Sequence, residues 1–239
     1  KQLKNFTEYL TYLHNSTEEI DTLFSNLLIG VTQFFRDPEA FKVLKQAFET
    51  KAFQERAYSD SLRVWVCACS TGEEVYSVAM LLQEALDPNP NASSLSNSEM
   101  DSTEARINLS NSAKPVQIFA TDIDNFAIQK ARNGLYPLSI ANDISTARLK
   151  RFFLAEADGS GYRIQKKIRD MVVFSDHDVV KDPPFSKLDL ICCRNLLIYM
   201  NDSLQKRVLS TFHYALRDQG YLFLGSSETL GNLEPLFDV

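Results

Sequence analysis

The chain has 239 residues, of which 44% are hydrophobic and 23% charged, and its formal net charge is −6. These values predict a globular chain with one sizeable core and exclude two full domains, a disordered chain and a fibrous one. The acidic balance argues against a nucleic-acid-binding protein. No apolar run approaches the roughly 18–20 residues of a membrane span and no signal peptide follows Lys1, so we expect a cytoplasmic protein without membrane insertion.

The first 60 residues are predicted to be helical. One set of apolar residues recurs at helical spacing up to Val31, and a second helical segment follows Asp37-Pro38. The first set comprises Phe24, Leu27, Leu28 and Val31. Because the first residue is Lys1 rather than Met, we expect a piece of a longer polypeptide.

After residue 60, short apolar strands alternate with amphipathic helices. The expected strands are 64–68, 116–121, 171–174, 188–193 and 221–225, and the expected helices are 74–86, 125–132 and 203–216. This alternation predicts a doubly wound α/β fold, with a mostly parallel sheet covered on both faces. Residues 87–115 are rich in serine and asparagine, so we expect a flexible insert there.

The alternation breaks between residues 135 and 170, which predicts a small inserted subdomain. A helix is expected at 148–153, and a turn at 159–161 is expected to lead into an edge strand. Residues 148–169 hold seven basic and two acidic residues, a net charge of +5. This basic segment is either a solvated face or a docking surface for an acidic partner.

Four cysteines lie beside the apolar runs, at Cys67, Cys69, Cys192 and Cys193. Their spacing lacks the paired C-x-x-C of zinc sites, and a cytosol keeps thiols reduced. We therefore predict buried, reduced cysteines and no metal site.

The turn after the first strand is where a doubly wound fold places its ligand. Here residues 69–74 contain one glycine followed by Glu73 and Glu74, and two carboxylates would repel a dinucleotide's phosphates. No P-loop sequence is present. The acidic turn suits a ligand with positive charge near its adenosine, such as S-adenosylmethionine. A capping box, in which Thr71 caps the helix and Glu74 bonds the cap's own N–H, explains it equally well.

An acidic residue at the end of the second strand favours the ligand interpretation. Such a residue binds ribose hydroxyls about 20 residues after the glycine turn. Asp122 lies 50 residues after Gly72, and removing the 29-residue insert leaves 21. Asp124 is expected to cap the next helix.

Five ordered sequence runs carry a resemblance to a known family. They are Val31–Arg36, Cys69–Ser77, Ala120–Asp124, Cys193–Tyr199 and Gly225–Glu228. With them the chain resembles, over nearly its whole length, the chemotaxis receptor glutamate methyltransferases, the CheR family. The resemblance implies a Rossmann-like fold, S-adenosylmethionine as cofactor with S-adenosylhomocysteine as product, and glutamate side chains on cytoplasmic chemoreceptor helices as substrate.

The same resemblance implies the site residues. They are Thr32 and Arg36, which would reach the cofactor; Glu74 and Asp122, which would hold its amino-acid part and ribose; Asp178 and Val179, along the adenine; Arg194 and Asn195, closing the pocket; and Tyr199, near the transferable methyl group. Arg36 and Tyr199 are the catalytic candidates, because a guanidinium fork can orient a carboxylate and Tyr199 offers an aromatic wall and a hydroxyl. The alternative for Tyr199 is an ordinary buried helix tyrosine.

Residue ranges and partners also follow from the resemblance. Residues 1–60 would be the remnant of an N-terminal helical domain with a linker helix, and residues 61–239 the methyltransferase domain. Within that domain, residues 137–170 would be the small β-containing subdomain that grips a tethering peptide in part of the family. The implied partners are the receptor helices, docked through the basic segment 148–169, and other signalling domains fused to the chain.

Four positions depart from the family pattern, and two of them bear on the cofactor. Gly30 and Asp178 stand where the family has asparagine, Val75 replaces a proline, and Ser226 replaces a histidine. The family's last sheet strands would begin where the chain stops, at Val239. These features leave open a second function, a degenerate cofactor-binding or scaffolding module of a multidomain signalling protein.

Overall fold

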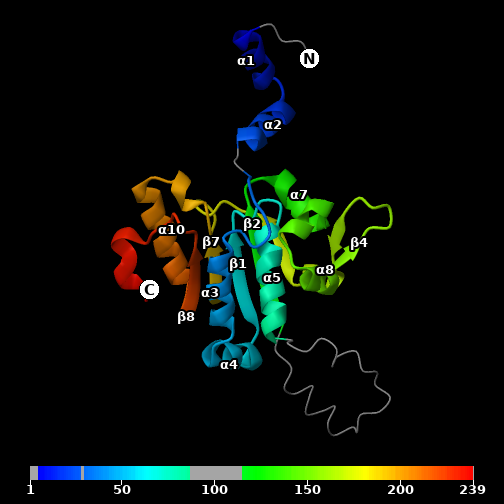
Figure 1. Ribbon diagram of the computed structural model, residues 1–239. Helices are drawn as coiled ribbons and strands as arrows, with labels where there is room; N and C mark the ends of the chain where they lie inside the picture. Colours follow the sequence, from blue (N-terminus) through cyan, green and yellow to red (C-terminus); the bar gives the residue numbers. More distant parts are fainter. Residues whose placement is uncertain (1–4, 28–29, 87–114, 239) are drawn as a thin grey trace.

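A five-stranded parallel sheet forms the centre of the computed structural model, which describes residues 5–27, 30–86 and 115–238 (Figure 1). The strands lie in the order β6-β2-β1-β7-β8, and every neighbouring pair is parallel. Their bounds are β1 (Leu62–Cys67), β2 (Val116–Asp122), β6 (Val172–Asp176), β7 (Leu188–Cys193) and β8 (Leu216–Leu224). The predicted doubly wound α/β fold is confirmed. Except for Pro115, the predicted insert lies outside the described residues.

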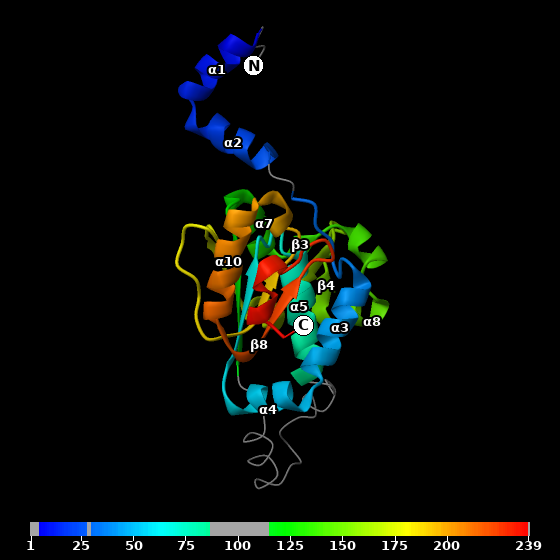
Figure 2. The same cartoon turned by 90° about the vertical axis from the view of Figure 1, so that its left-hand side faces the viewer.

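Helices cover both faces of this sheet (Figure 2). The helices on the faces are α3 (Pro38–Phe48), α5 (Glu73–Leu86), α7 (Asn125–Asn133) and α10 (Asp202–Ala215), while α4 (Lys51–Ser59) lies across the end of the sheet where the strands begin (Figures 1 and 2). Val64 and Val66 of β1 belong to the core cluster that contains α3 and α5. The alternate residue Trp65 belongs to a second cluster with Phe212 of α10. Side chains of a strand point alternately to its two faces, so β1 is apolar from Val64 to Cys67 because both faces are covered.

The N-terminal residues depart in one place from the two predicted helical segments. The helices α1 (Phe6–His14) and α2 (Thr17–Leu27) lie together beyond the sheet, on the side where its strands end (Figures 1 and 2). Residues 30–37 are not helical, so the helical prediction around Val31 is wrong, while Leu28 lies outside the described residues. The cause is tertiary, because the Phe35 N–H donates to Ser77 Oγ of α5 (3.0 Å) instead of a helical carbonyl. Helix begins again at Pro38, a residue suited to a first helical turn.

A small antiparallel sheet interrupts the alternation, with the order β3-β5-β4. Its elements are β3 (Leu135–Tyr136), η2 (Leu138–Asn142), α8 (Thr146–Phe152), β4 (Phe153–Ala155), β5 (Tyr162–Ile164) and α9 (Lys166–Arg169). The prediction of an edge strand at β5 is wrong, because β5 pairs with strands on both sides. Gly161 permits this central position, since a Cβ there would lie 2.0 Å from the Tyr136 carbonyl oxygen.

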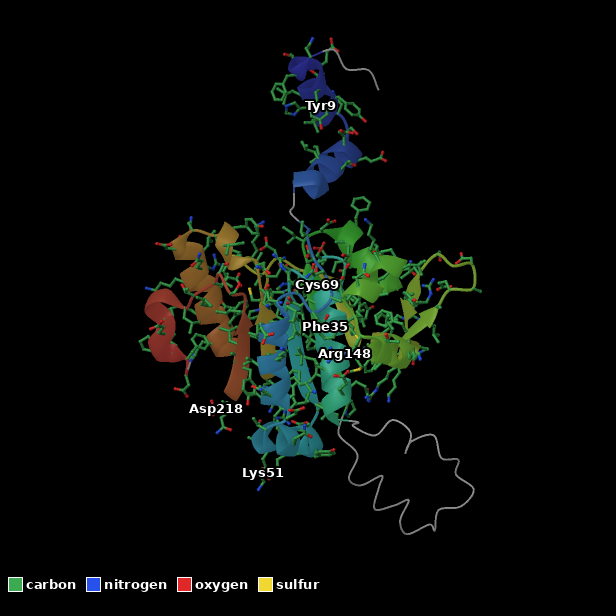
Figure 3. The ribbon with its side chains drawn as sticks, viewed as in Figure 1. Tyr9, Phe35, Lys51, Cys69, Arg148 and Asp218 are labelled. Carbon is green, nitrogen blue, oxygen red and sulfur yellow. The ribbon has the colours of Figure 1, made fainter. Side chains whose placement is uncertain are left out.

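The basic segment 148–169 forms several ion pairs within the chain. Arg148 binds Glu84 of α5 through two hydrogen bonds of 2.8 Å, and its guanidinium lies 4.2 Å from the centre of the Phe35 ring (Figure 3). Arg163 pairs with Glu156, and Lys166 pairs with Asp170. These pairs offset part of the segment's charge.

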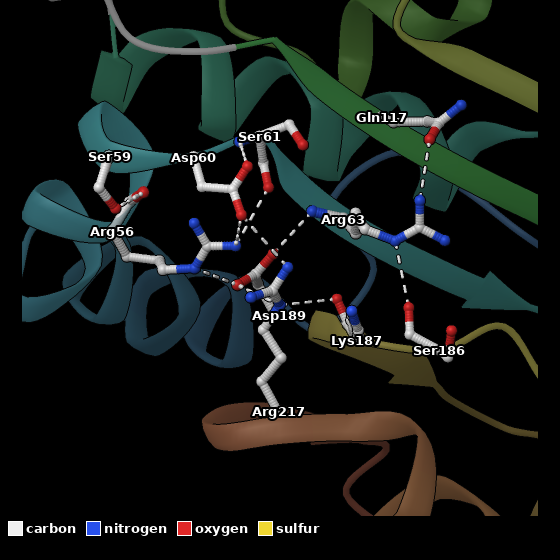
Figure 4. A network of polar contacts seen from close by, with 10 residues as sticks. All are labelled: Arg56, Ser59, Asp60, Ser61, Arg63, Gln117, Ser186, Lys187, Asp189 and Arg217. Atoms are coloured by element: carbon white, nitrogen blue, oxygen red, sulfur yellow. Dashed lines mark hydrogen bonds and ion pairs between the residues drawn. The ribbon is translucent and has the colours of Figure 1, made fainter.

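A network of charged side chains closes the amino end of the sheet (Figure 4). Asp189 of β7 is only 6% exposed. It accepts the Arg63 N–H (2.8 Å) and lies 3.0 Å from Arg56 Nε and 3.7 Å from Arg217 Nε. The network therefore joins α4, β1, β7 and β8 around one carboxylate.

All four cysteines are free and buried, as predicted. Burial raises the pKa of the Cys67, Cys69 and Cys192 thiols. Within residues 5–27, 30–86 and 115–238, no cluster of histidine, cysteine and acidic side chains could hold a metal ion. In the same part of the chain, no helix is long and apolar enough to cross a membrane.

Candidate functional site

The turn between β1 and α5 has an unusual backbone. Ala68 and Ser70 have φ angles of 50° and 47°, and Gly72 has a φ of 94°. A Cβ on Gly72 would lie 2.9 Å from the Ala131 Cβ, so the turn packs closely on α7. Such strained positions persist only where surrounding contacts hold them, and they cluster at functional sites. The predicted ligand turn is thus a tightly held loop at the carboxyl end of the sheet.

Asp122 ends β2 beside this turn. Its Oδ2 accepts the Ser70 N–H (2.7 Å) and its Oδ1 accepts the Asp124 N–H (2.9 Å). Burial raises the pKa of the Asp122 carboxyl, and the two N–H donors oppose that rise. Asp124 caps α7 by accepting the N–H groups of residues 126 and 127, which confirms its predicted role. Asp122 therefore also supports the turn, besides being placed where a ribose carboxylate is expected.

Glu74 does not form the capping box that the sequence allowed. Its Oε2 accepts a hydrogen bond of 3.0 Å from Arg194 Nη1, while the Thr71 hydroxyl donates to Glu73 Oε2 (2.7 Å). The capping-box interpretation of Glu74 is wrong, because the Arg194 guanidinium offers a charged partner. Glu74 instead presents a carboxylate at the carboxyl ends of β1 and β7.

Burial raises the pKa of Glu74 to about 7, although Arg194 lowers it. Burial also raises the pKa of Glu73. These carboxyls therefore lie where a further cation would favour their charged form.

Arg194, directly after β7, is the centre of this cluster. Its side chain has no exposed surface, and Nη2 donates to Asp37 Oδ2 (2.6 Å) and to the Arg36 carbonyl (3.1 Å). Its guanidinium carbon also lies 5.3 Å and 4.9 Å from the ring centres of Phe41 and Phe223. Arg194 faces inward and ties residues 36–37 to the end of the sheet.

Residues 30–37 form a wall against the turn. The Gly30 carbonyl accepts from Ser70 Oγ (3.2 Å), and a Cβ on Gly30 would lie 3.3 Å from that oxygen. Arg36 donates to the Val31 carbonyl (3.0 Å), and both Arg36 and Thr32 are half-buried. The departure at Gly30 therefore coincides with a close approach of the wall to the turn.

The segment after β7 carries two more predicted residues. Asn195 has a φ of 60°, and its backbone N–H donates to Glu228 Oε2 (3.0 Å). Tyr199 lies in η3 (Leu197–Tyr199) and is 60% exposed. The alternative of a buried helix tyrosine is therefore wrong, because Tyr199 ends a short 3₁₀ turn at the surface.

Asp178 and Val179 follow β6 at the far side of the sheet. Asp178 accepts the Val180 N–H (2.9 Å) and pairs with Lys181 (3.0 Å), so its carboxylate stabilises its own turn. Val179 packs against the second core cluster.

The structure brings several of the predicted residues together. Arg36, Glu74 and Arg194 share one cluster, and Ser70 links Asp122 to Gly30. Sequence reasoning missed three connecting residues, Asp37, Ser70 and Glu228. Ser70 and Glu228 lie within runs that carry the family resemblance, although the resemblance implied no role for them.

The arrangement fits the predicted cofactor. The carboxylates of Glu73, Glu74 and Asp122 gather around the turn, and of these three only Glu74 pairs with the buried Arg194. S-adenosylmethionine carries a sulfonium and an ammonium group. Their positive charge stabilises the ionised form of Glu74 and Asp122, whose pKa values burial raises.

Comparison with known proteins gives the family. The family model described as "CheR methyltransferase, SAM binding domain" matches residues 30–105 and 102–239. An "Uncharacterized 104.1 kDa protein in hypE 3'region" of Rhodobacter capsulatus is 37% identical over 239 residues, covering 100% of this chain and 23% of that protein. The chemotaxis protein methyltransferase of Borreliella burgdorferi is 31% identical, covering 96% of this chain and 76% of that protein.

A similarly named relative supports the same assignment. The chemotaxis protein methyltransferase of Salmonella typhimurium is 30% identical, covering 97% of this chain and 72% of that protein. The chain thus spans under a quarter of the Rhodobacter protein and about three quarters of the other two. It belongs to the CheR methyltransferase family, matches that family's SAM-binding domain, and so takes S-adenosylmethionine as cofactor.

Proposed function

We propose that this chain transfers the methyl group of S-adenosylmethionine to glutamate side chains on the cytoplasmic helices of chemoreceptors, forming methyl esters that set receptor adaptation. The observation that carries the proposal is the buried cluster of Arg36, Glu74 and Arg194 beside Asp122, at the carboxyl end of a parallel sheet. The names of the Borreliella and Salmonella relatives support a role in chemotaxis.

The binding residues divide by the part of the cofactor that they hold. Glu74 binds its amino-acid part and Asp122 its ribose region, while Asp178 and Val179 lie along the adenine. Thr32 reaches the cofactor from the wall, and Asn195 closes the pocket. Arg194 acts through others, because its buried guanidinium holds Glu74 and the Arg36 backbone in place.

The proposed reaction requires no proton transfer by a side chain of the protein. A glutamate side chain is already ionised at neutral pH, so no general base is needed. When bound, S-adenosylmethionine supplies an electrophilic methyl group, and S-adenosylhomocysteine leaves with the C–S electron pair as the ester O–C bond forms. Arg36 orients the substrate carboxylate and Tyr199 confines it. Such positioning can lower a barrier by about 7–11 kcal/mol.

The partners are chemoreceptor helices and domains fused to this chain. The basic segment 148–169 would meet the acidic receptor helices, although Arg148 and Arg163 already have acidic partners within the chain. The length of the Rhodobacter relative supports fusion to further domains.

Methyl transfer to a receptor fragment tests the proposal. We expect label from methyl-labelled S-adenosylmethionine to enter a purified cytoplasmic receptor fragment and to leave as volatile methanol after mild alkali, as a carboxyl ester requires. A matched fragment with its target glutamates replaced by alanine should take up no label. Asp122→Asn, which keeps the size of the side chain, should weaken cofactor binding.

A different result would contradict the proposal. Binding of S-adenosylhomocysteine without transfer to any receptor fragment would contradict the enzyme proposal and support the scaffolding module.

A further inference from the structure

Glu228 binds four backbone N–H groups, of which only that of Asn195 has been described above. Its Oε1 accepts from Leu196 (2.9 Å) and Leu197 (2.8 Å), and its Oε2 accepts from Asn195 (3.0 Å) and Gly225 (2.7 Å). Oε1 therefore binds only the segment after β7, while Oε2 bridges that segment and Gly225, directly after β8. Hydrogen bonds to a charged acceptor are stronger than neutral ones.

The three amides of residues 195–197 follow one another in the chain. Asn195 has a φ of 60°, and Leu196 has right-handed helical angles. Successive N–H groups turned to one side make a concavity that binds an anion. Here the chain supplies the anion itself, because the Glu228 carboxylate fills that concavity.

Gly225 shows how closely this carboxylate is confined. A Cβ on Gly225 would lie 2.7 Å from Glu228 Oε2 and 3.2 Å from the Asn195 nitrogen. Any larger residue at 225 would displace the carboxylate or the amides. The glycine and the glutamate thus belong to one device, which we call the Glu228 latch (Gly225, Glu228 and the N–H groups of residues 195–197).

The Glu228 latch is connected directly to Tyr199. The Tyr199 N–H donates to the Leu196 carbonyl (3.2 Å), so Tyr199 closes the turn whose first amides Glu228 holds. Gln205 of α10 donates to the carbonyls of Leu197 (3.0 Å) and Met200 (3.0 Å) on the other side of that turn. The backbone that carries Tyr199 is therefore held from both sides.

We infer that Glu228 is a positioning residue that fixes the Asn195–Tyr199 turn and so places the exposed Tyr199 side chain for methyl transfer. The inference rests on the proposed function. Arg194 is held separately by Glu74 and Asp37, so losing the latch should affect the turn more than the cofactor-binding carboxylates.

Glu228→Gln tests the inference, because the amide keeps the shape but turns an NH₂ group toward two of the four N–H donors. We expect kcat to fall about 10- to 100-fold, since a misplacement of about 1 Å can cost that much. The Kd of S-adenosylhomocysteine should change less than about threefold, because Asn195 is the one proposed cofactor-binding residue in this turn and the others lie in other segments. Glu234→Gln, at an exposed carboxylate in η4 (Gly231–Leu236), is the matched control and should leave both constants unchanged.

A double-mutant cycle with Tyr199→Phe separates positioning from mere structural support. If Glu228 acts through Tyr199, Glu228→Gln should lower kcat less than about threefold in the Tyr199→Phe background. An equal fold-loss of kcat in both backgrounds would overturn the inference, and so would an unchanged kcat in folded Glu228→Gln protein. Should that variant not fold, Gly225→Ala displaces the same carboxylate and is judged by the same cycle.

Failure of the proposed function would be distinguishable. If the wild-type chain methylates no receptor fragment, amide hydrogen exchange decides the inference. Glu228→Gln should then accelerate exchange at residues 195–199 at least about tenfold over Glu234→Gln, with residues 70–76 unchanged. Unchanged exchange at residues 195–199 would overturn it.

Discussion

The two ends of the parallel sheet each bury a charge among partners of the opposite sign, but with opposite polarity. At the amino end, Asp189 lies among arginines (Figure 4). At the carboxyl end, Arg194 lies between Glu74 and Asp37. One end is therefore a carboxylate surrounded by cations, and the other is a cation surrounded by carboxylates.

The two networks differ in their net charge and in their burial. At the amino end the paired charges balance, because Arg56 and Arg217 pair with both Asp189 and Asp60, and the arginines are partly exposed to solvent. At the carboxyl end Glu74 and Asp37 outnumber their partner Arg194, and burial raises the pKa of Glu74 to about 7. A buried excess of carboxylate is stabilised by a cationic ligand. Similar charge networks can therefore serve stability at one end of the sheet and ligand binding at the other.

Replacing Arg194 should have the largest effect. Arg194→Met leaves Glu74 without its buried partner, so at pH 8 we expect the free energy of unfolding to fall by about 3–5 kcal/mol. Cofactor binding should be lost as well, because residues 36–37 lose their tie to the sheet. Denaturant unfolding and calorimetric titration measure the two effects. Full cofactor affinity in the folded variant would mean that the carboxyl-end network is only structural.

Replacing Asp189 should affect stability alone. Asp189→Asn weakens its pairing with Arg56 and Arg217, and we expect about 1–3 kcal/mol of lost stability, at the lower end because these arginines are partly exposed. The Kd of S-adenosylhomocysteine should stay unchanged well below the melting temperature. A parallel fall in affinity would remove the distinction between the two ends.

The raised pKa of Glu74 predicts opposite pH dependences for binding and stability. Around pH 7 the carboxyl becomes protonated, so cofactor affinity should fall about tenfold in total between pH 8 and pH 6. The folded pKa exceeds the usual 4.5, so the folded state binds more protons between pH 4.5 and 7, and this group's contribution to stability declines as pH rises. Titrations at pH 6 to 8 check the first trend, which Glu74→Gln should abolish.

The smallest expected effect concerns the basic segment 148–169. Changing Lys150, Lys166 and Lys167 to glutamate should slow receptor methylation severalfold at low salt and much less at 0.15 M, where the screening length is about 8 Å. A triple change of Lys51, Lys187 and Lys206, outside this segment, is the control. Wild-type rates for the 148–169 variant at low ionic strength would leave that segment a solvated face.

The sheet could be predicted because strands that are buried on both faces have short, nearly continuous apolar sequences. Residues 64–67 of β1 and 190–193 of β7 are continuously apolar, and the predicted bounds differ from the observed ones by at most two residues in β1 and not at all in β7. Residues 30–37 could not be predicted in the same way. Their apolar side chains recur at helical spacing, yet the Phe35 N–H bonds a serine 42 residues away. Long-range partners of this kind leave no local pattern.

The candidate site divides along the same line. Asp122 could be placed because strand ends and the glycine turn have a regular spacing. Neither Glu74 pairing with Arg194, 120 residues away, nor the Glu228 latch follows from spacing. Both join segments through one side chain each, and only the fold brings those segments together.

The buried cysteines allow the opening of the central strands to be measured without an introduced label. Cys67 and Cys193 are neighbours in the register of β1 and β7, and all four thiols are free and shielded from solvent. An alkylating reagent can reach Cys67, Cys192 and Cys193 only when β1 and β7 separate from their covering helices, so the rate of reaction at these three thiols reports openings of the sheet. Addition of cofactor at a free concentration L should slow that reaction by about the factor 1 + L/Kd, because a ligand that binds only the closed sheet makes each opening rarer.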